Sequence, residues 1–201
     1  YEPLYGLLRR RMETYRSDTE RQPDITLDGT KEDYEKLRKQ YPHLSIEECE
    51  YSCAGAEFYM KLLKHQGFMI HASAVEKEGK AYLFSAPSGT GKSTHAQLWR
   101  QTFKGEPIRI INDDKPAVCL QNGVFYACGT PFSGKTDKNE NRKAPIQGLC
   151  MLHRGKTNKI QKITSGEALP LILPQTLFYG DEEETNLLLS FLDRFLQSVP
   201  V

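Results

Sequence analysis

The chain has 201 residues, a formal net charge of +1 at pH 7, and hydrophobic residues at 38% of its positions. This length predicts one domain, or one domain with a modest appendage, and a core that needs no disulfides. The balanced charge and the lack of an apolar run of about 20 residues give no indication of a nucleic-acid partner or a membrane span. The amino end shows no signal-peptide pattern, and none of the five cysteines is spaced as Cys-x-x-Cys. We therefore expect reduced thiols in a cytoplasmic protein.

The N-terminal third predicts helices and one short strand. Apolar residues recur at helical spacing over residues 4–12, which predicts a short amphipathic helix. Residues 25–27 predict a strand, and residues 30–33 match a capping box that opens a polar helix. Apolar residues on one side predict a further helix over about residues 54–67. We expect all of these elements, residues 1–67, to pack as one segment on the rest of the chain.

From residue 68 onward the apolar pattern changes from helical to extended. Residues 68–75 and 81–85 predict a hairpin, and residues 109–112 predict a strand that ends in an acidic pair. A second hairpin is predicted over residues 117–127, because Asn122-Gly123 suits a two-residue turn with positive φ. The sheet should therefore contain antiparallel pairs.

The C-terminal part combines a loop, strands and helices. Residues 133–143 are polar and basic, which predicts a mobile loop. Strands are predicted at residues 146–153 and 159–163, and helices at residues 165–170 and 182–197.

Together these elements predict an α/β (α+β) fold with a mixed, largely antiparallel sheet and flanking helices. We expect residues 68–201 to form the core, and the whole chain to make one compact domain.

Residues 86–93 match a phosphate-binding loop (P-loop) with the sequence Ala-Pro-Ser-Gly-Thr-Gly-Lys-Ser. The loop joins a predicted strand to a predicted helix, so a phosphate would lie at the helix N-terminus. Lys92 would reach the β- and γ-phosphates, and the Ser93 hydroxyl would bind Mg²⁺. The pattern predicts a nucleoside triphosphate, ATP or GTP, with Mg²⁺. The residues expected to bind it are Pro87, Ser88, Gly89, Thr90, Gly91, Lys92, Ser93 and Thr94.

Three further positions carry candidate chemistry. Asp113 and Asp114 follow an apolar strand, and two such carboxylates can bind Mg²⁺ and leave one as general base. The alternative is a solvated turn paired with Lys115. His71 lies in an apolar segment, where a hydrogen-bonded core histidine is the alternative to a catalytic role. Lys135 would contact the transferred phosphate or the acceptor, or simply be solvated.

The combination of His71, the P-loop and Asp113-Asp114 resembles the HPr kinase/phosphorylase-like proteins, whose nucleotide-binding core is shared with phosphoenolpyruvate carboxykinases. The segment from Gly129 to Lys135 is similar to HPr-kinase-related proteins of this size. The resemblance implies that fold, with Asp114 as general base, Asp113 near the metal and His71 orienting an aspartate.

The same resemblance implies an ATP-dependent kinase that phosphorylates a serine or threonine hydroxyl of a small protein or peptide, such as the peptide precursor of a natural product. Because HPr kinases are oligomers, the resemblance leaves a homo-oligomer open. Two other functions are open, a small-molecule kinase of the same fold and a nucleotide-binding sensor or scaffold without catalysis. The acidic pair argues against the sensor, because a mere binder needs no base beside its metal.

Overall fold

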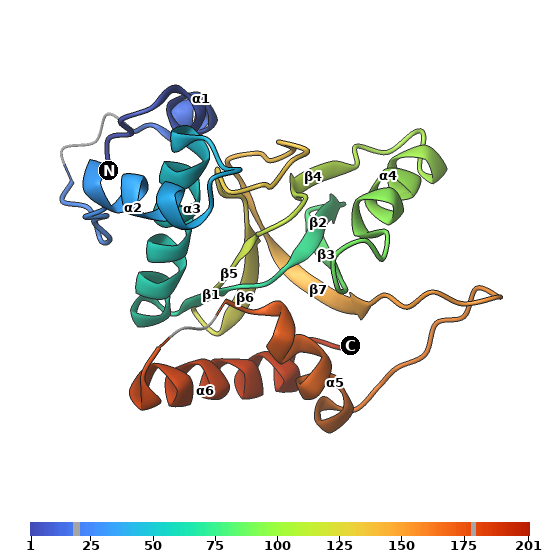
Figure 1. Ribbon diagram of the computed structural model, residues 1–201. Helices are drawn as coiled ribbons and strands as arrows, with labels where there is room; N and C mark the ends of the chain where they lie inside the picture. The colour runs from blue at the N-terminus through green and yellow to red at the C-terminus, as the bar shows by residue number, and fades with distance from the viewer. Residues whose placement is uncertain (18–20, 178–179) are drawn as a thin grey trace.

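A seven-stranded sheet forms the centre of the molecule (Figure 1). The computed structural model describes residues 1–17, 21–177 and 180–201. The strand order in the sheet is β1-β5-β6-β7-β3-β2-β4. The strands are β1 (Gly67–Met69), β2 (Ala72–Lys77), β3 (Lys80–Ser85), β4 (Arg109–Asn112), β5 (Ala117–Gln121), β6 (Val124–Cys128) and β7 (Lys143–Met151).

The pairing in the sheet is antiparallel throughout, except between β3 and β7, which are parallel. The prediction of an α/β fold with a mixed, largely antiparallel sheet is therefore confirmed. The β5–β6 hairpin also turns as predicted, because Asn122 and Gly123 have φ values of 50° and 79°.

Helices cover both faces of this sheet and one of its ends (Figure 1). The α-helices are α1 (Gly6–Met12), α2 (Lys31–Gln40), α3 (Ile46–Leu62), α4 (Lys92–Thr102), α5 (Ser165–Ile172) and α6 (Glu182–Ser198). Short 3₁₀ turns are η1 (Glu13–Tyr15), η2 (Leu63–His65) and η3 (Leu173–Gln175). Within the described part of the chain, no helix combines the length and the apolar character that crossing a bilayer requires.

The side chains of β2 and β3 point alternately to the two faces of the sheet, and their neighbours show which helix lies on which face. Ala74 and Leu83 belong to the main core with α5 and α6, whereas Val75 and Phe84 pack with Ala96 of α4. Since neighbouring strand residues point to opposite faces, α4 lies across the sheet from α5 and α6.

The N-terminal helices are fastened to one another by a buried carboxylate. Glu50 of α3 is 0% exposed and accepts hydrogen bonds from the Leu4 and Tyr5 N–H groups and from the Tyr1 hydroxyl. The carboxylate thus satisfies backbone donors at the start of α1, which the helix cannot satisfy itself. A second apolar cluster then joins α1 and α3 to Phe132, which lies beyond β6.

Four predicted elements differ from the structure. The helix predicted from residue 54 begins at residue 46, because Ser45 and Glu48 form a capping box. The single strand predicted over residues 68–75 is two strands in the structure. β1 pairs with β5, whereas β2 pairs with β3 and β4. Residues 25–27 and 159–163 form no strand, since neither segment has a pairing partner in the sheet.

Candidate functional site

Three segments from distant parts of the sequence meet at one edge of the sheet. β3 and β4 are both antiparallel to β2, so β3 and β4 end at the edge where β2 begins. The P-loop follows β3, Asp113 and Asp114 follow β4, and His71 precedes β2. The pairing of Ala72 with Ser85 sets the register, and the Ser85 hydroxyl donates to the His71 carbonyl at 2.9 Å. The topology therefore brings the three predicted groups together.

The P-loop has the backbone that its glycines predict. Gly89 and Gly91 have φ values of 77° and 115°, in the left-handed region that favours glycine. α4 begins at Lys92, so Ser93 and Thr94 lie in its first turn. The N–H groups of this first turn have no partner within the helix, which is what an anion site at a helix N-terminus requires.

Lys92 lies inside this loop with 7% of its surface exposed. Its Nζ donates to the Ala86 carbonyl at 2.9 Å. Burial lowers the pKa of the Lys92 ammonium, while the carboxylates of Asp114 and Asp113 act in the opposite direction. The charges of the P-loop and of the acidic pair are thus close enough to act on each other.

Asp113 is almost fully buried, with 2% of its surface exposed. Its Oδ1 accepts a hydrogen bond of 2.7 Å from the Ser73 hydroxyl, and its Oδ2 has no hydrogen-bond partner among the described residues. An unsatisfied buried carboxylate oxygen is costly, and a bound cation would satisfy it.

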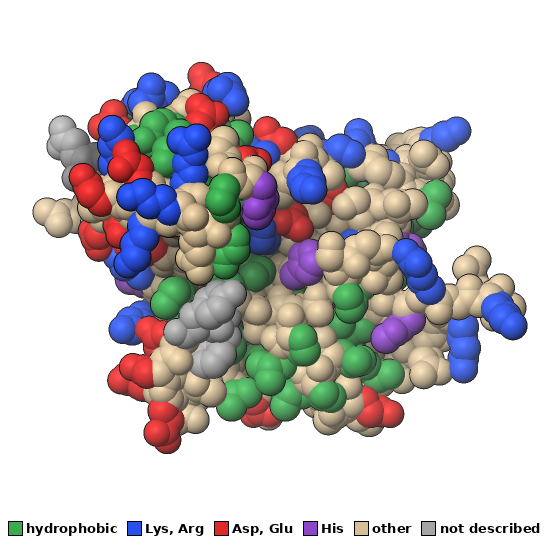
Figure 2. Space-filling view, in the orientation of Figure 1, with side chains coloured by type: hydrophobic (Ala, Val, Ile, Leu, Met, Phe, Trp, Pro, Cys, Tyr) green, Lys and Arg blue, Asp and Glu red, His purple; other side chains and the backbone are tan. Residues whose placement is uncertain are grey.

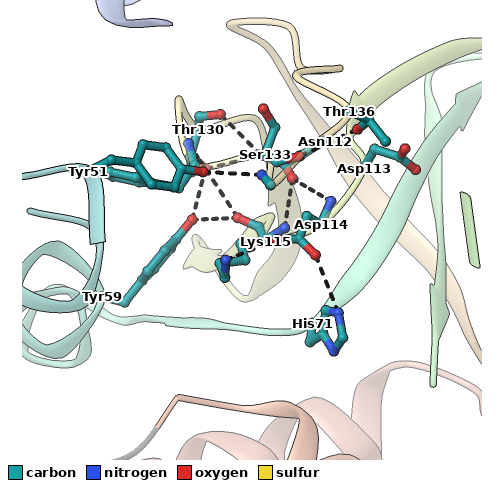
Figure 3. A network of polar contacts seen from close by, with 12 residues as sticks. Tyr51, Tyr59, His71, Asn112, Asp113, Asp114, Lys115, Thr130, Ser133 and Thr136 are labelled. Atoms are coloured by element: carbon teal, nitrogen blue, oxygen red, sulfur yellow. Dashed lines mark hydrogen bonds and ion pairs between the residues drawn. The ribbon is translucent and has the colours of Figure 1, made fainter. Parts of the chain in front are cut away.

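Asp114 has two cationic or hydrogen-bonding partners (Figure 3). His71 Nε2 lies 3.3 Å from its Oδ1, and Lys115 Nζ lies 2.9 Å from its Oδ2. Burial acts to raise the pKa of Asp114, but the His71 hydrogen bond and the Lys115 charge lower it to about 2. Asp114 is therefore a carboxylate at neutral pH.

Asn112 builds the turn that carries both aspartates. Its Oδ1 accepts hydrogen bonds from the N–H groups of Asp114 and Lys115, at 2.9 and 2.8 Å. Its Nδ2 donates to the carbonyl and hydroxyl oxygens of Thr130, both at 3.1 Å. The Tyr59 hydroxyl contacts the Thr130 hydroxyl at 2.8 Å and donates to the Lys115 carbonyl. These bonds fix the backbone of the turn.

His71 is held from behind by Gln175 of η3. The His71 N–H donates to the Gln175 carbonyl at 2.6 Å, and His71 Nδ1 lies 3.2 Å from Gln175 Oε1. Gln175 is buried, which limits the ways the imidazole can rotate. The structure thus places His71 where it can orient the Asp114 carboxylate.

Gly134 lies against the Asp114 carboxylate. Its φ is 65°, and a Cβ on this residue would lie 2.6 Å from Asp114 Oδ2. The Gly134 N–H donates to the Tyr51 hydroxyl at 3.1 Å, and Arg11 Nη2 donates to the Gly134 carbonyl at 2.9 Å. The N-terminal helices α1 and α3 therefore position the loop that faces Asp114.

Lys135 is the predicted residue that the structure does not join to the acidic pair. Its side chain is exposed, and its charge acts on Glu48 at the start of α3. The cation that contacts Asp114 is Lys115 instead.

Several residues of the site were not predicted from the sequence. They are Tyr51, Tyr59, Ser73, Asn112, Thr130, Gly134 and Gln175. Asn112 had a local signal, because an asparagine before two aspartates at a strand end is typical of a side-chain-capped turn. Thr130 and Gly134 lie in the segment from Gly129 to Lys135 that the resemblance covers, but their roles had no local signal, and neither did the other residues, since their partners lie far away in the sequence.

Comparisons with known proteins add a distant likeness. No family model and no curated protein sequence matches the chain. Among solved structures, the HPr(Ser) kinase/phosphatase from Coxiella burnetii aligns over 63% of this chain and 93% of its own, with 13% sequence identity and a TM-score of 0.36. At these values the likeness says nothing about the activity of this protein.

Proposed function

We propose that the protein is an ATP-dependent kinase that transfers the γ-phosphate to a serine or threonine hydroxyl of a small protein or peptide. One observation carries the proposal: the P-loop with its buried Lys92 lies at the same end of the sheet as Asp113, whose buried Oδ2 has no hydrogen-bond partner among the described residues. In sequence terms the chain would then be a distant relative of the HPr kinase-like proteins.

Each residue has a distinct role in this proposal. The loop from Pro87 to Ser93 would bind the phosphates, and Lys92 would leave the Ala86 carbonyl to bind their β- and γ-oxygens. Ser93 and Asp113 would hold Mg²⁺. Two points support Ser93 and Asp113 as Mg²⁺ ligands. The Asp113 Oδ2 has no hydrogen-bond partner among the described residues, and Mg²⁺ in nucleotide sites usually binds one or two protein ligands together with the phosphates. When bound, Mg²⁺ neutralises charge that develops on the phosphate oxygens.

Asp114 would accept the proton of the acceptor hydroxyl. A carboxylate with a pKa of about 2 is a weak base, so it would orient the hydroxyl first. The proton would move late, once bonding to phosphorus has made the hydroxyl acidic, as a loose transition state allows. His71 and Lys115 would hold the carboxylate in place, and Gly134 would leave room beside it.

The first experiment measures stabilisation by nucleotide. At about 100 times its Kd, MgATP should raise the free energy of unfolding by about 2.7 kcal/mol. Lys92→Ala should lose most of this gain, with an affinity reduced about 30-fold or more, because a charge-assisted contact to the phosphates is removed. Lys39→Ala is the control, since Lys39 lies exposed on α2.

The second experiment separates catalysis from sensing. ADP release is measured with serine-containing peptides and with small hydroxyl metabolites as acceptors. The proposal expects release with peptides that requires Lys92. In the first experiment, equal stabilisation of wild type and Lys92→Ala by MgATP would refute the P-loop site. Stabilisation without ADP release for any acceptor would favour the nucleotide sensor.

A further inference from the structure

Residues 152–164, here called the arm, leave the sheet after β7 and return at α5. Every residue of the arm from 153 to 162 is exposed, and the arm forms neither helix nor strand. It projects well beyond the body of the molecule (Figure 1). Packing within this chain therefore does not account for the conformation of residues 153–162.

The arm is uniformly basic. It contains no acidic residue, and Lys and Arg side chains gather along the projection (Figure 2). Its basic side chains are Arg154, Lys156, Lys159 and Lys162. In residues 1–17, 21–177 and 180–201, none of the four arm cations lies in an ion pair. The arm therefore presents unneutralised positive charge.

The arm also exposes one large apolar side chain. Ile160 is 87% exposed, the largest exposed fraction among the large hydrophobic residues that the structure describes. Burial of an isoleucine side chain is favourable, but the folded single chain does not obtain this free energy from Ile160. A partner that covers Ile160 would recover it.

The base of the arm is attached to the nucleotide site. The Leu152 N–H donates to the Ser85 carbonyl at 2.8 Å, where β3 meets the P-loop. Arg154 Nη2 donates to the carbonyl of Gly89, within the P-loop, at 2.6 Å. On the returning limb, the Ile163 N–H donates to the Val201 carbonyl at 3.0 Å. A partner bound at the base of the arm would therefore lie beside the phosphate site.

We propose that the arm is the docking surface for an acidic segment of the acceptor protein, a segment that carries an apolar residue for Ile160. The identification of this partner as the acceptor rests on the proposed kinase function. The positive charge of the arm favours a partner with carboxylates, and an apolar contact with Ile160 adds to the affinity. A nucleic acid fits less well, because the chain has a net charge of only +1 and a pI of about 7.8. A membrane is also disfavoured, since one isoleucine is a weak anchor.

The test measures binding of a designed peptide, without any need for catalysis. A short fluorescein-labelled peptide has glutamates and leucines around one serine, and in its control peptide glutamine replaces every glutamate. Fluorescence anisotropy gives the affinity of each for the full chain, at about 50 mM and about 300 mM salt. A single-stranded oligonucleotide and phosphatidylserine vesicles are measured in parallel.

The arm variant combines Lys156→Glu, Lys159→Glu and Lys162→Glu, and leaves the P-loop contact of Arg154 intact. The control variant combines Lys31→Glu, Lys36→Glu and Lys39→Glu on α2, with the same change in net charge. We expect the arm variant to bind the acidic peptide about tenfold or more weakly than the control variant does. Ile160→Ser should weaken binding without changing its dependence on salt.

Equal affinities for the arm and control variants would overturn the proposal, as would tighter binding of the glutamine peptide, the oligonucleotide or the vesicles. Stabilisation by MgATP is measured on the same variants and should not change. If MgATP fails to stabilise wild type while the arm still selects the acidic peptide, the kinase function fails and the docking surface stands.

Discussion

The two adjacent aspartates differ most in their partners. Asp113 is buried and one of its oxygens has no hydrogen-bond partner among the described residues, whereas Asp114 is held by His71 and Lys115. Asp114→Asn keeps the shape of the side chain but removes the proton acceptor, so turnover should fall by about 10² to 10⁴-fold with nucleotide affinity near wild type. Asp113→Asn should instead weaken binding of nucleotide with Mg²⁺. Steady-state kinetics and calorimetric titration measure the two effects.

His71→Ala is the companion variant, and it should slow turnover less than Asp114→Asn, since in the proposed mechanism His71 acts only through Asp114. Near-normal turnover of Asp114→Asn at saturating ATP and acceptor would contradict its role as base. If Asp114→Asn loses nucleotide binding and Asp113→Asn loses turnover, the roles of the two aspartates are exchanged.

Gly134 provides a second test on a single residue. Gly134→Ala would place a methyl group 2.6 Å from Asp114 Oδ2, so the carboxylate or the loop must move. A displacement of about 1 Å in a reacting group can reduce turnover about 10²-fold, and we expect a loss of that order.

Gly79→Ala is the matched control for Gly134→Ala. Gly79 has a similar φ of 72°, but a Cβ there meets no atom within 4 Å. Both variants carry the backbone strain, and only one disturbs Asp114. Equal turnover in the two variants, measured as ADP release, would show that the approach of Gly134 to Asp114 is irrelevant to the reaction.

At the scale of elements, the capping box of α3 gives a prediction that depends on pH. The Glu48 carboxylate accepts a hydrogen bond from the Ser45 N–H, and the Ser45 hydroxyl accepts one from the Glu48 N–H. The backbone bond, followed by the hydroxyl of Ser45, lowers the pKa of Glu48 below its ordinary value of 4.5. The stabilisation is therefore present above about pH 4.5 and is lost as pH falls through the lowered pKa.

We expect Glu48→Gln to lower the free energy of unfolding at neutral pH and to approach wild type in acid, as the pH falls below the lowered pKa of Glu48. Ser45→Ala should cost about 1 kcal/mol at neutral pH, since it removes the N-cap side chain. Urea denaturation at neutral and acidic pH measures the differences. A wild-type advantage over Glu48→Gln that persists unchanged in acid would show that the carboxylate does not cap the helix.

At the scale of the whole molecule, Phe132 joins the N-terminal helices to the sheet. It is 4% exposed, its ring lies 5.5 to 5.9 Å from those of Tyr51, Phe58 and Tyr59, and a Cβ on Gly55 would lie 3.0 Å from it. Phe132→Ala should cost about 3 to 5 kcal/mol through lost burial and the cavity.

If the chain is one compact domain, that loss should appear at both ends of the molecule. Trp99, the only tryptophan, packs on Tyr82 and Phe84 across the sheet from α5 and α6. We expect Trp99 fluorescence and far-ultraviolet circular dichroism to give the same lowered midpoint for Phe132→Ala. If the midpoint measured by circular dichroism is lowered while the midpoint measured by Trp99 fluorescence is unchanged, the chain unfolds as two units.

Local chemistry was sufficient to predict much of the fold. Asn122-Gly123 specified a tight hairpin through its backbone freedom, and the Thr30 capping box specified the start of α2. The P-loop was predicted for the same reason, because its glycines, Lys92 and Ser93 act within a few residues of one another. The sequence by itself therefore determined the mixed, largely antiparallel sheet and the candidate residues after β3 and β4.

Only the tertiary structure decided how those residues are held. His71 meets Gln175 across 104 positions, and the loop at Gly134 is held by Arg11 across 123 positions. Such partners leave no periodic signal in the sequence, because the contact depends on the strand order and on which helix covers which face. The different surroundings of Asp113 and Asp114 arise in the same way: adjacent strand-end residues point in different directions, and the folded neighbours of each set its chemistry.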